Sequence, residues 1–189
     1  MLPELADGRR HAHSSIICGR VARLPKNPRE GRVHLVKKAR TILTSGVFDI
    51  IHPGHIYLLR YASRLKGRRG RLVVIIARDE TVRRRKRPPI FSEYERLMIV
   101  RSLKFVDEAY LGYRPFSFKK VIERFNPDIV VFGYDQDKIR REFLKEVERE
   151  GWRVKVVKAP KMSSARLNSS SKVLERIARL LSGKKLKLY

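Results

Sequence analysis

The sequence predicts an α/β domain with a five-stranded parallel sheet, and three features of the chain support this prediction. From residue 41 onward, short apolar runs alternate with amphipathic stretches, and the alternation occurs five times. Several of the runs are apolar at nearly every position, as strands are when helices cover both faces of their sheet. The chain has 189 residues, 42% of them hydrophobic, which is enough to build one core. We therefore expect a single Rossmann-like domain, doubly wound, with right-handed crossovers between its strands.

The first half of the domain is expected to contain two strands and two helices. Residues 41–46 form a β-branched run that ends in glycine, which is typical of a buried strand. Pro53 precedes residues 54–65, whose apolar side chains recur at helical spacing. Residues 71–77 are apolar after the first arginine and predict the second strand. The helix expected at 92–104 begins with a capping box, a serine followed three residues later by a glutamate.

The second half repeats the pattern, and turn residues separate its elements. The pair Asn126-Pro127 ends one amphipathic stretch, because proline disfavours the helical conformation of the residue before it. Gly151 ends another, as glycine commonly does just after the last turn of a helix. We expect strands at 108–111, 128–133 and 153–157, and helices at 117–125, 138–150 and 171–181.

Residues 37–182 are expected to form the folded domain, with different kinds of sequence on either side of it. Residues 1–36 are rich in Arg, Pro and Gly and do not continue the alternation, so we expect a basic, poorly ordered N-terminal extension. A mis-assigned start codon is the alternative explanation of these residues. Residues 183–189 are expected to form a basic C-terminal tail.

Composition excludes several classes of protein. No stretch approaches the roughly 20 apolar residues of a membrane span, and the N-terminus lacks the apolar run of a secretory signal. Cys18 is the only cysteine, which excludes an internal disulfide and a C-x-x-C metal or redox site. Side-chain amides are rare and arginine outnumbers lysine, which favours a cytoplasmic protein from a hot habitat.

The formal net charge of +26 is concentrated in three blocks of the chain. Residues 1–40 carry +7, residues 64–89 carry +9 and residues 153–189 carry +10, while the stretches between them are neutral. Such an excess of cations suggests nucleic acid as a partner, and a nucleic-acid-binding module is the alternative to an enzyme. Against that alternative, the sequence contains no known nucleic-acid-binding motif, and its basic blocks contain few aromatic residues.

The densest chemical signal is the run GVFDIIHPGH at residues 46–55, between the first expected strand and the first expected helix. Glycine at the end of a strand lets the backbone approach a ligand closely, and a helix N-terminus attracts anions. His52 and His55 flank Gly54 and can donate hydrogen bonds to phosphate oxygens. The run therefore predicts a triphosphate site. Half of a zinc site is an alternative, although no third ligand lies near in sequence, and two ordinary histidines at a helix start are another.

The pattern G-x-F-D-x-x-H-x-G-H resembles the nucleotidyltransferase superfamily that includes glycerol-3-phosphate cytidylyltransferase, phosphopantetheine adenylyltransferase and the archaeal FAD synthases. The resemblance extends from about Thr41 to about Ile177. The runs A-R-D-x-T-V at 77–82 and G-Y-D-Q at 133–136 look most like archaeal FAD synthase, an FMN adenylyltransferase. The resemblance implies adenylyl transfer from ATP to FMN, giving FAD and pyrophosphate, with a divalent ion such as Mg²⁺. It leaves a cytidylyltransferase acting on a small phosphorylated alcohol, such as glycerol 3-phosphate, as the alternative enzyme. It also implies a homodimer.

The resemblance also assigns roles to individual residues. It implies that the phosphates meet the two histidines, a lysine of the basic loop, an arginine of the second helix, and two serines before the last helix. Position 47 is Val where the superfamily commonly has Thr, so only a backbone contact is expected there. Asp49 is expected to support a ligand-contacting residue without touching the ligand itself, or to orient His55, and no metal ligand is assigned. The implied catalytic residues are His52, His55, Lys86 and Arg96, and the implied ATP-binding residues are Val47, Phe48, His52, Pro53, Gly54, His55, Asp135, Ser170 and Ser171.

Overall fold

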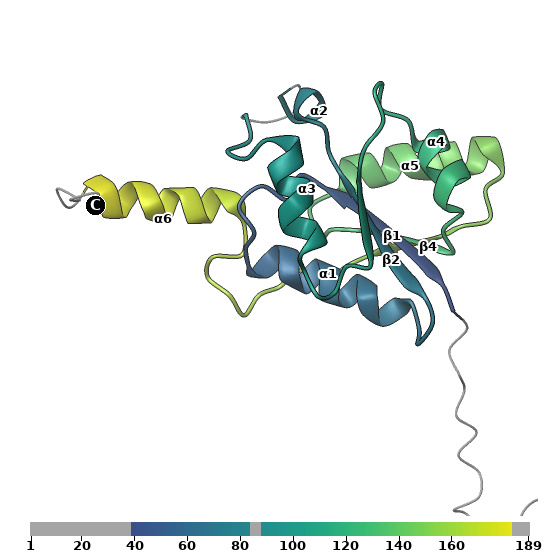
Figure 1. The fold of residues 1–189 in the computed structure, drawn as a ribbon, viewed down its shortest axis with the longest axis horizontal. Coiled ribbons are helices and arrows are strands. Elements are labelled where there is room, and N and C mark those ends of the chain that lie inside the picture. The colour runs from purple at the N-terminus through teal and green to yellow at the C-terminus, as the bar shows by residue number, and fades with distance from the viewer. Residues whose placement is uncertain (1–38, 84–87, 183–189) are drawn as a thin grey trace, which may run out of the picture. The chain divides into compact units, whose positions relative to one another are not determined.

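The computed structural model describes residues 39–83 and 88–182 (Figure 1). The N-terminal extension expected at 1–36 and the tail expected at 183–189 lie outside the described residues, as does Lys86. Within the described part, strands and helices alternate along the chain, and Figure 1 shows helices on both sides of a central sheet.

All five strands pair in parallel, which confirms the predicted fold class. Their order across the sheet is β3-β2-β1-β4-β5. β2 and β3 are therefore added on one side of the central β1, and β4 and β5 on its other side. The order reverses between β1 and β4, and open α/β sheets bind ligands beyond the carboxyl ends of the strands at such a point. The strands are β1 (Thr41–Gly46), β2 (Arg71–Ile76), β3 (Glu108–Leu111), β4 (Ile129–Phe132) and β5 (Lys155–Lys158).

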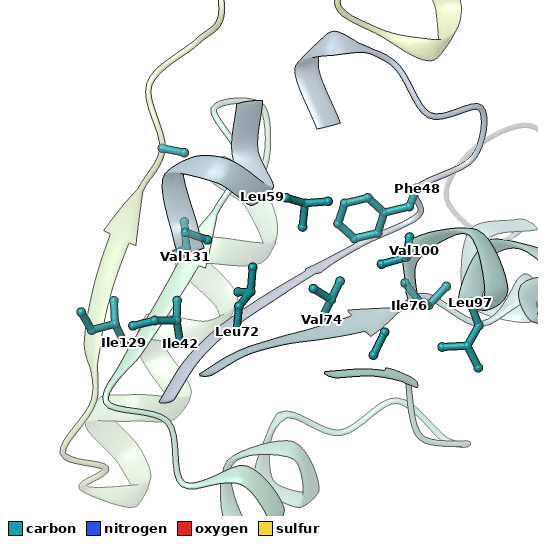
Figure 2. Packing of buried hydrophobic residues seen from close by; sticks show 13 residues of the cluster. Ile42, Phe48, Leu59, Leu72, Val74, Ile76, Leu97, Val100, Ile129 and Val131 are labelled. Carbon is teal, nitrogen blue, oxygen red and sulfur yellow. The ribbon is translucent and has the colours of Figure 1, made fainter. Parts of the chain in front are cut away.

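One face of the sheet is covered by α1 (Pro53–Leu65) and α3 (Glu93–Arg101). Successive residues of a strand point to opposite faces, and here both faces are apolar. On this face the strands contribute residues such as Ile42 and Val74, which pack against Leu59 of α1 and Val100 of α3 (Figure 2).

The opposite face is covered by α4 (Phe118–Phe125) and α5 (Asp137–Glu150). Leu43 and Val73 point to this side and pack with Phe125 and Phe143 from the two helices. Burial on both faces explains why the central strands read as continuous apolar runs in the sequence.

The helices differ from the sequence prediction in several details. A short helix that was not expected, α2 (Asp79–Arg83), follows β2, and α3 ends at Arg101 rather than at residue 104. The last helix, α6 (Ser170–Ser182), begins one residue earlier than expected, and none of its residues is buried. Among the described helices, none is both long and apolar enough to cross a membrane.

Candidate functional site

The carboxyl ends of β1 and β4 meet at the reversal of strand order, and a side chain ties them together. Gln136 follows β4, and its Nε2 donates a hydrogen bond to the carbonyl oxygen of Ser45 in β1 at 3.0 Å. Its Oε1 accepts a hydrogen bond from the backbone N–H of Gly133 at 2.6 Å. The loops after β1 and β4 are thereby held side by side. Sequence reasoning did not assign a role to Gln136, although it ends the G-Y-D-Q run.

The loop after β1 contains two residues in the left-handed backbone region. Phe48 has φ 53° and Ile50 has φ 54°, conformations that cost non-glycine residues on the order of 1–3 kcal/mol each. Burial of the Phe48 ring, which is 1% exposed and lies in the core over the sheet (Figure 2), helps to hold this conformation. Since the Phe48 side chain is committed to the core, only its backbone can face a ligand.

The loop ends at His52, which caps the N-terminus of α1. The His52 Nδ1 accepts a hydrogen bond from the backbone N–H of His55 at 3.3 Å. The rings of His52 and His55 are stacked, with centroids 3.7 Å apart and planes inclined by 21°. A neutral imidazole that accepts at Nδ1 carries its proton at Nε2, where it donates. The structure thus gives His52 a hydrogen-bond donor at the N-terminus of a helix, where anions bind.

The electrostatic surroundings of His52 favour its neutral form. The side chain is 7% exposed, and this burial lowers the pKa of His52 below its ordinary value of 6.5, while the negative charge of Asp135 offsets part of the shift. Asp135 follows β4, so the loop after β4 contributes to the electrostatic surroundings of His52.

We expect the His52 imidazole to titrate below pH 6.5 in the ligand-free protein, and Asp135→Asn to lower its pKa further. The substitution removes the charge that raises this pKa, and histidine ring NMR during a pH titration measures both values. Because the unfolded chain binds this proton at higher pH than the folded protein, the His52 contribution to the free energy of unfolding rises with pH up to about 6.5. A pKa above 6.5, or an upward shift in the Asp135→Asn variant, would contradict this description.

The N-terminus of α6 is packed against the same loop. The Ser170 hydroxyl donates to the carbonyl oxygen of Asp49 at 2.7 Å. Asn168 is buried, and its Nδ2 donates to the carbonyl oxygen of Met162 at 2.7 Å. Gly54 makes this approach possible, because a Cβ there would lie 2.3 Å from the carbonyl oxygen of Asn168. The start of α1 therefore packs closely against the backbone that leads into α6.

Gly54→Ala is expected to lower the free energy of unfolding by about 1–3 kcal/mol, because the added methyl group collides with a backbone atom rather than a movable side chain. It should also lower activity, since the same methyl group would lie 3.0 Å from the His52 ring. Gly112→Ala is the matched control, because a Cβ there meets its nearest neighbour at an ordinary 3.5 Å. Chemical denaturation of both variants measures the difference, and equal stabilities would show that residue 168 has room to move.

The structure corrects the prediction that Arg96 contacts phosphate. Its side chain is 0% exposed, and its guanidinium donates to Asp79 Oδ1 at 2.6 Å and to three carbonyl oxygens. Two of these oxygens belong to Val47, at 2.5 Å, and Ala77, at 2.8 Å, the residues that directly follow β1 and β2. The third belongs to Phe91, at 3.1 Å. Arg96 is therefore a positioning residue that fixes the loop after β1, and it does not present its charge to a ligand.

The Asp49 carboxylate bonds to the backbone of the residues just before α3. It accepts hydrogen bonds from the backbone N–H groups of Ile90 and Phe91 at 3.0–3.1 Å. Asp49 thus ties the backbone just before α3 to the histidine loop.

Comparisons with known proteins agree with this geometry. A family model described as cytidylyltransferase-like matches residues 43–176. An FAD synthase from Methanothermus fervidus is 44% identical over 138 residues, which are 73% of this chain and 94% of that protein. An FAD synthase from Methanothermobacter thermautotrophicus is 46% identical over 138 residues, covering 73% of this chain and 91% of that protein. The chain belongs to the FAD synthase family.

Solved structures also resemble this member of the FAD synthase family. A Thermoplasma volcanium protein described as a lipopolysaccharide core biosynthesis protein is 38% identical, with a TM-score of 0.60, over 66% of this chain and 98% of that chain. A protein of unknown function from Archaeoglobus fulgidus has a TM-score of 0.54 at 22% identity, over 66% of this chain and 93% of that chain. The second likeness supports the fold alone.

Three further predicted site residues of this FAD synthase family member are exposed, whereas Lys86 is not among the described residues. Pro53 is exposed at the first position of α1, and Asp135 is exposed after β4. Ser171 is exposed in the first turn of α6. The fold thus gathers residues from three separate parts of the chain at the carboxyl edge of the sheet.

Proposed function

We propose that this protein transfers the adenylyl group of ATP to FMN, forming FAD and pyrophosphate. The observation that carries the proposal is the His52 donor at the N-terminus of α1, placed at the reversal of strand order in a chain that matches FAD synthases over 73% of its length. A helix N-terminus with an imidazole donor is suited to the negative charge of a polyphosphate.

The proposed reaction is an in-line displacement at the α-phosphorus of ATP. An oxygen of the FMN phosphate forms a new bond to that phosphorus, and the bond to the oxygen bridging the α- and β-phosphates breaks. Pyrophosphate leaves with the bonding electron pair. An ionised phosphate needs no strong base to attack, so catalysis comes from positioning and from stabilising charge on the phosphates.

The chain's own residues divide this work between them. We assign phosphate contacts to the Nε2–H of His52, to the neighbouring His55 and to the backbone of the loop at Val47 and Phe48. The first turn of α6, with Ser170 and Ser171, offers a second helix N-terminus facing the same loop. The Ser170 hydroxyl donates to the carbonyl oxygen of Asp49, so it would have to give up that bond to donate to a phosphate. The list of assigned ATP contacts is completed by Pro53, Gly54, Asp135 and Lys86.

Mg²⁺ is proposed as an ion that arrives with ATP. Among the described residues, no group of three His, Cys, Asp or Glu side chains is placed to hold a metal ion. Mg²⁺ is commonly bound through substrate phosphates and only one or two carboxylates, and it would supply neutralising charge there. A cytoplasmic location and a homodimer are further proposals that follow from the family.

Paired incubations test the proposed function. The protein is mixed with FMN and either ATP or CTP, and separately with glycerol 3-phosphate and either nucleotide, and the products are separated by chromatography. We expect FAD only from FMN with ATP. A cytidylylated product would indicate the alternative enzyme, and salt-sensitive RNA or DNA binding with no pyrophosphate release from any pair would indicate a nucleic-acid-binding module.

A further inference from the structure

An open cavity of about 510 Å³ lies outside the histidine loop, beyond the carboxyl ends of β2 and β3. Its lining residues are Asp79, Glu80 and Arg83 from α2, and Arg114 from the segment that follows β3. The volume lies within the range of small-molecule sites. None of these four residues belongs to the ATP contacts assigned above.

The strand order places this cavity on the side of β1 opposite to Asp135. In the order β3-β2-β1-β4-β5, the cavity belongs to the strands on one side of β1, whereas Asp135 belongs to the strands on the other. Neighbouring strands are about 4.8 Å apart, so β2 and β3 end roughly 5–10 Å to the side of β1. The ATP contacts proposed above place the ribose at Asp135, on the β4 side of β1. The acceptor is then left the other side, over the ends of β2 and β3.

A buried carboxylate binds Arg114, one of the two arginines that line the cavity. Glu93, 3% exposed, accepts hydrogen bonds from Arg114 at 2.6 Å and from Arg78 at 2.8 Å. It also accepts one from the backbone N–H of Asp79 at 2.9 Å. The Arg114 side chain itself is 55% exposed. The ion pair with Glu93 thus fixes Arg114 at the edge of the open cavity that it lines.

An exposed aromatic side chain lies near Arg114. Tyr94 follows Glu93 in α3 and is 67% exposed, and its electrostatic interaction with Arg114 places the two side chains near each other. An exposed tyrosine offers a flat face to a ring system at little cost in side-chain entropy. Arginine and carboxylate groups beside it can donate and accept hydrogen bonds, respectively.

We propose that this cavity binds the isoalloxazine ring of FMN, an inference that rests on the proposed function. The pyrimidine edge of that ring presents two carbonyl oxygens on either side of an N–H group. Arg114 donates to a carbonyl oxygen of this edge, the carboxylate of Glu80 accepts from the ring N–H, and Tyr94 stacks on the ring. This assignment gives FMN specificity to residues of α2, α3 and the segment after β3.

The test compares Arg114→Gln and Tyr94→Leu with the unchanged protein. Both side chains are largely exposed, so both variants should fold, and Arg149→Gln on α5 is the matched control, an exposed arginine ion-paired to Glu146 and Glu150. We expect each test variant to raise the KM for FMN about tenfold, as the loss of one good contact does. The KM for ATP should stay within about twofold, and the control should change neither constant.

Riboflavin, which has the ring but no phosphate, separates the proposal from its competitors. Its inhibition constant should rise by the same factor as the KM for FMN, and quenching of its fluorescence by the protein should be lost in Tyr94→Leu. The proposal is overturned if both variants leave riboflavin binding unchanged, which would make Arg114 a phosphate contact at most. It is also overturned if they raise the KM values for ATP and FMN equally. The quenching titration uses no ATP, so it tests the cavity even if the protein forms no FAD and the proposed function fails.

Discussion

Replacing Arg96 by Met is expected to lower the free energy of unfolding by about 3–5 kcal/mol, the range observed when one partner of a buried ion pair is removed. Arg96 is 0% exposed, and its guanidinium is paired with Asp79 and bonded to the carbonyl oxygens of Val47 and Ala77. Methionine fills similar space but donates nothing, so these oxygens and the carboxylate lose their partner. Chemical denaturation followed by circular dichroism measures the change.

Arg149→Met on α5 is the control for this experiment. The Arg149 side chain is 64% exposed, and its ion pairs with Glu146 and Glu150 lie at the surface. Surface pairs of this kind contribute about 1 kcal/mol or less. If Arg96→Met were no more destabilising than Arg149→Met, Arg96 would not hold the loop, and its original assignment as a phosphate ligand would have to be reconsidered.

His52→Ala is expected to lower turnover by on the order of a hundredfold or more, as removal of a preorganised donor to transition-state charge does. The Nε2–H of His52 is the donor, because its Nδ1 accepts from the N–H of His55. The alanine variant also loses the helix cap, which should lower stability by about 1 kcal/mol. Steady-state kinetics and a denaturation curve on the same preparation measure both effects.

His52→Asn separates the two roles of this histidine. Asparagine is a good N-cap residue, so its side-chain oxygen should replace Nδ1 as the acceptor and keep the stability close to that of the unchanged protein. It should nonetheless lose turnover to a similar extent as alanine, because it lacks the ring donor at the same reach. Turnover near that of the unchanged protein in either variant would remove the His52 ring from the mechanism.

The strands could be predicted from the sequence because both faces of the sheet are buried. Residues 71–76 and 129–132 are apolar at almost every position, and the structure confirms them as β2 and β4. Local chemistry also determined several helix ends. The serine and glutamate of the expected capping box bond to each other at the start of α3, and Gly151 takes the left-handed conformation at the end of α5.

The short helix α2 could not be predicted, because it lacks a recognisable pattern of buried residues. Its five residues are too few to display a helical repeat, and it carries two acidic side chains in its first turn and only one buried residue, Val82. Its position depends on contacts far along the chain, such as the bonds between Asp79 and residues 93 and 96. Such tertiary contacts leave no periodic pattern in the segment itself.

The position of the histidine loop followed from the sequence, whereas the role of Arg96 did not. An arginine on an amphipathic helix is expected at the surface, yet Arg96 lies one helical turn before the buried Val100 and on the same face. That spacing was the available indication in the sequence that Arg96 is buried. The carbonyl groups that Arg96 satisfies belong to loops after β1 and β2, which only the folded sheet brings together.

The fate of the α-phosphate of ATP tests the central claim most directly. The protein is incubated with FMN, Mg²⁺ and ATP labelled with ³²P at either the α- or the γ-phosphate, and the products are separated. Adenylyl transfer predicts that the α-label appears in FAD and the γ-label in pyrophosphate. Label from the γ-phosphate in a flavin product, or no labelled FAD from α-labelled ATP, would contradict adenylyl transfer to FMN.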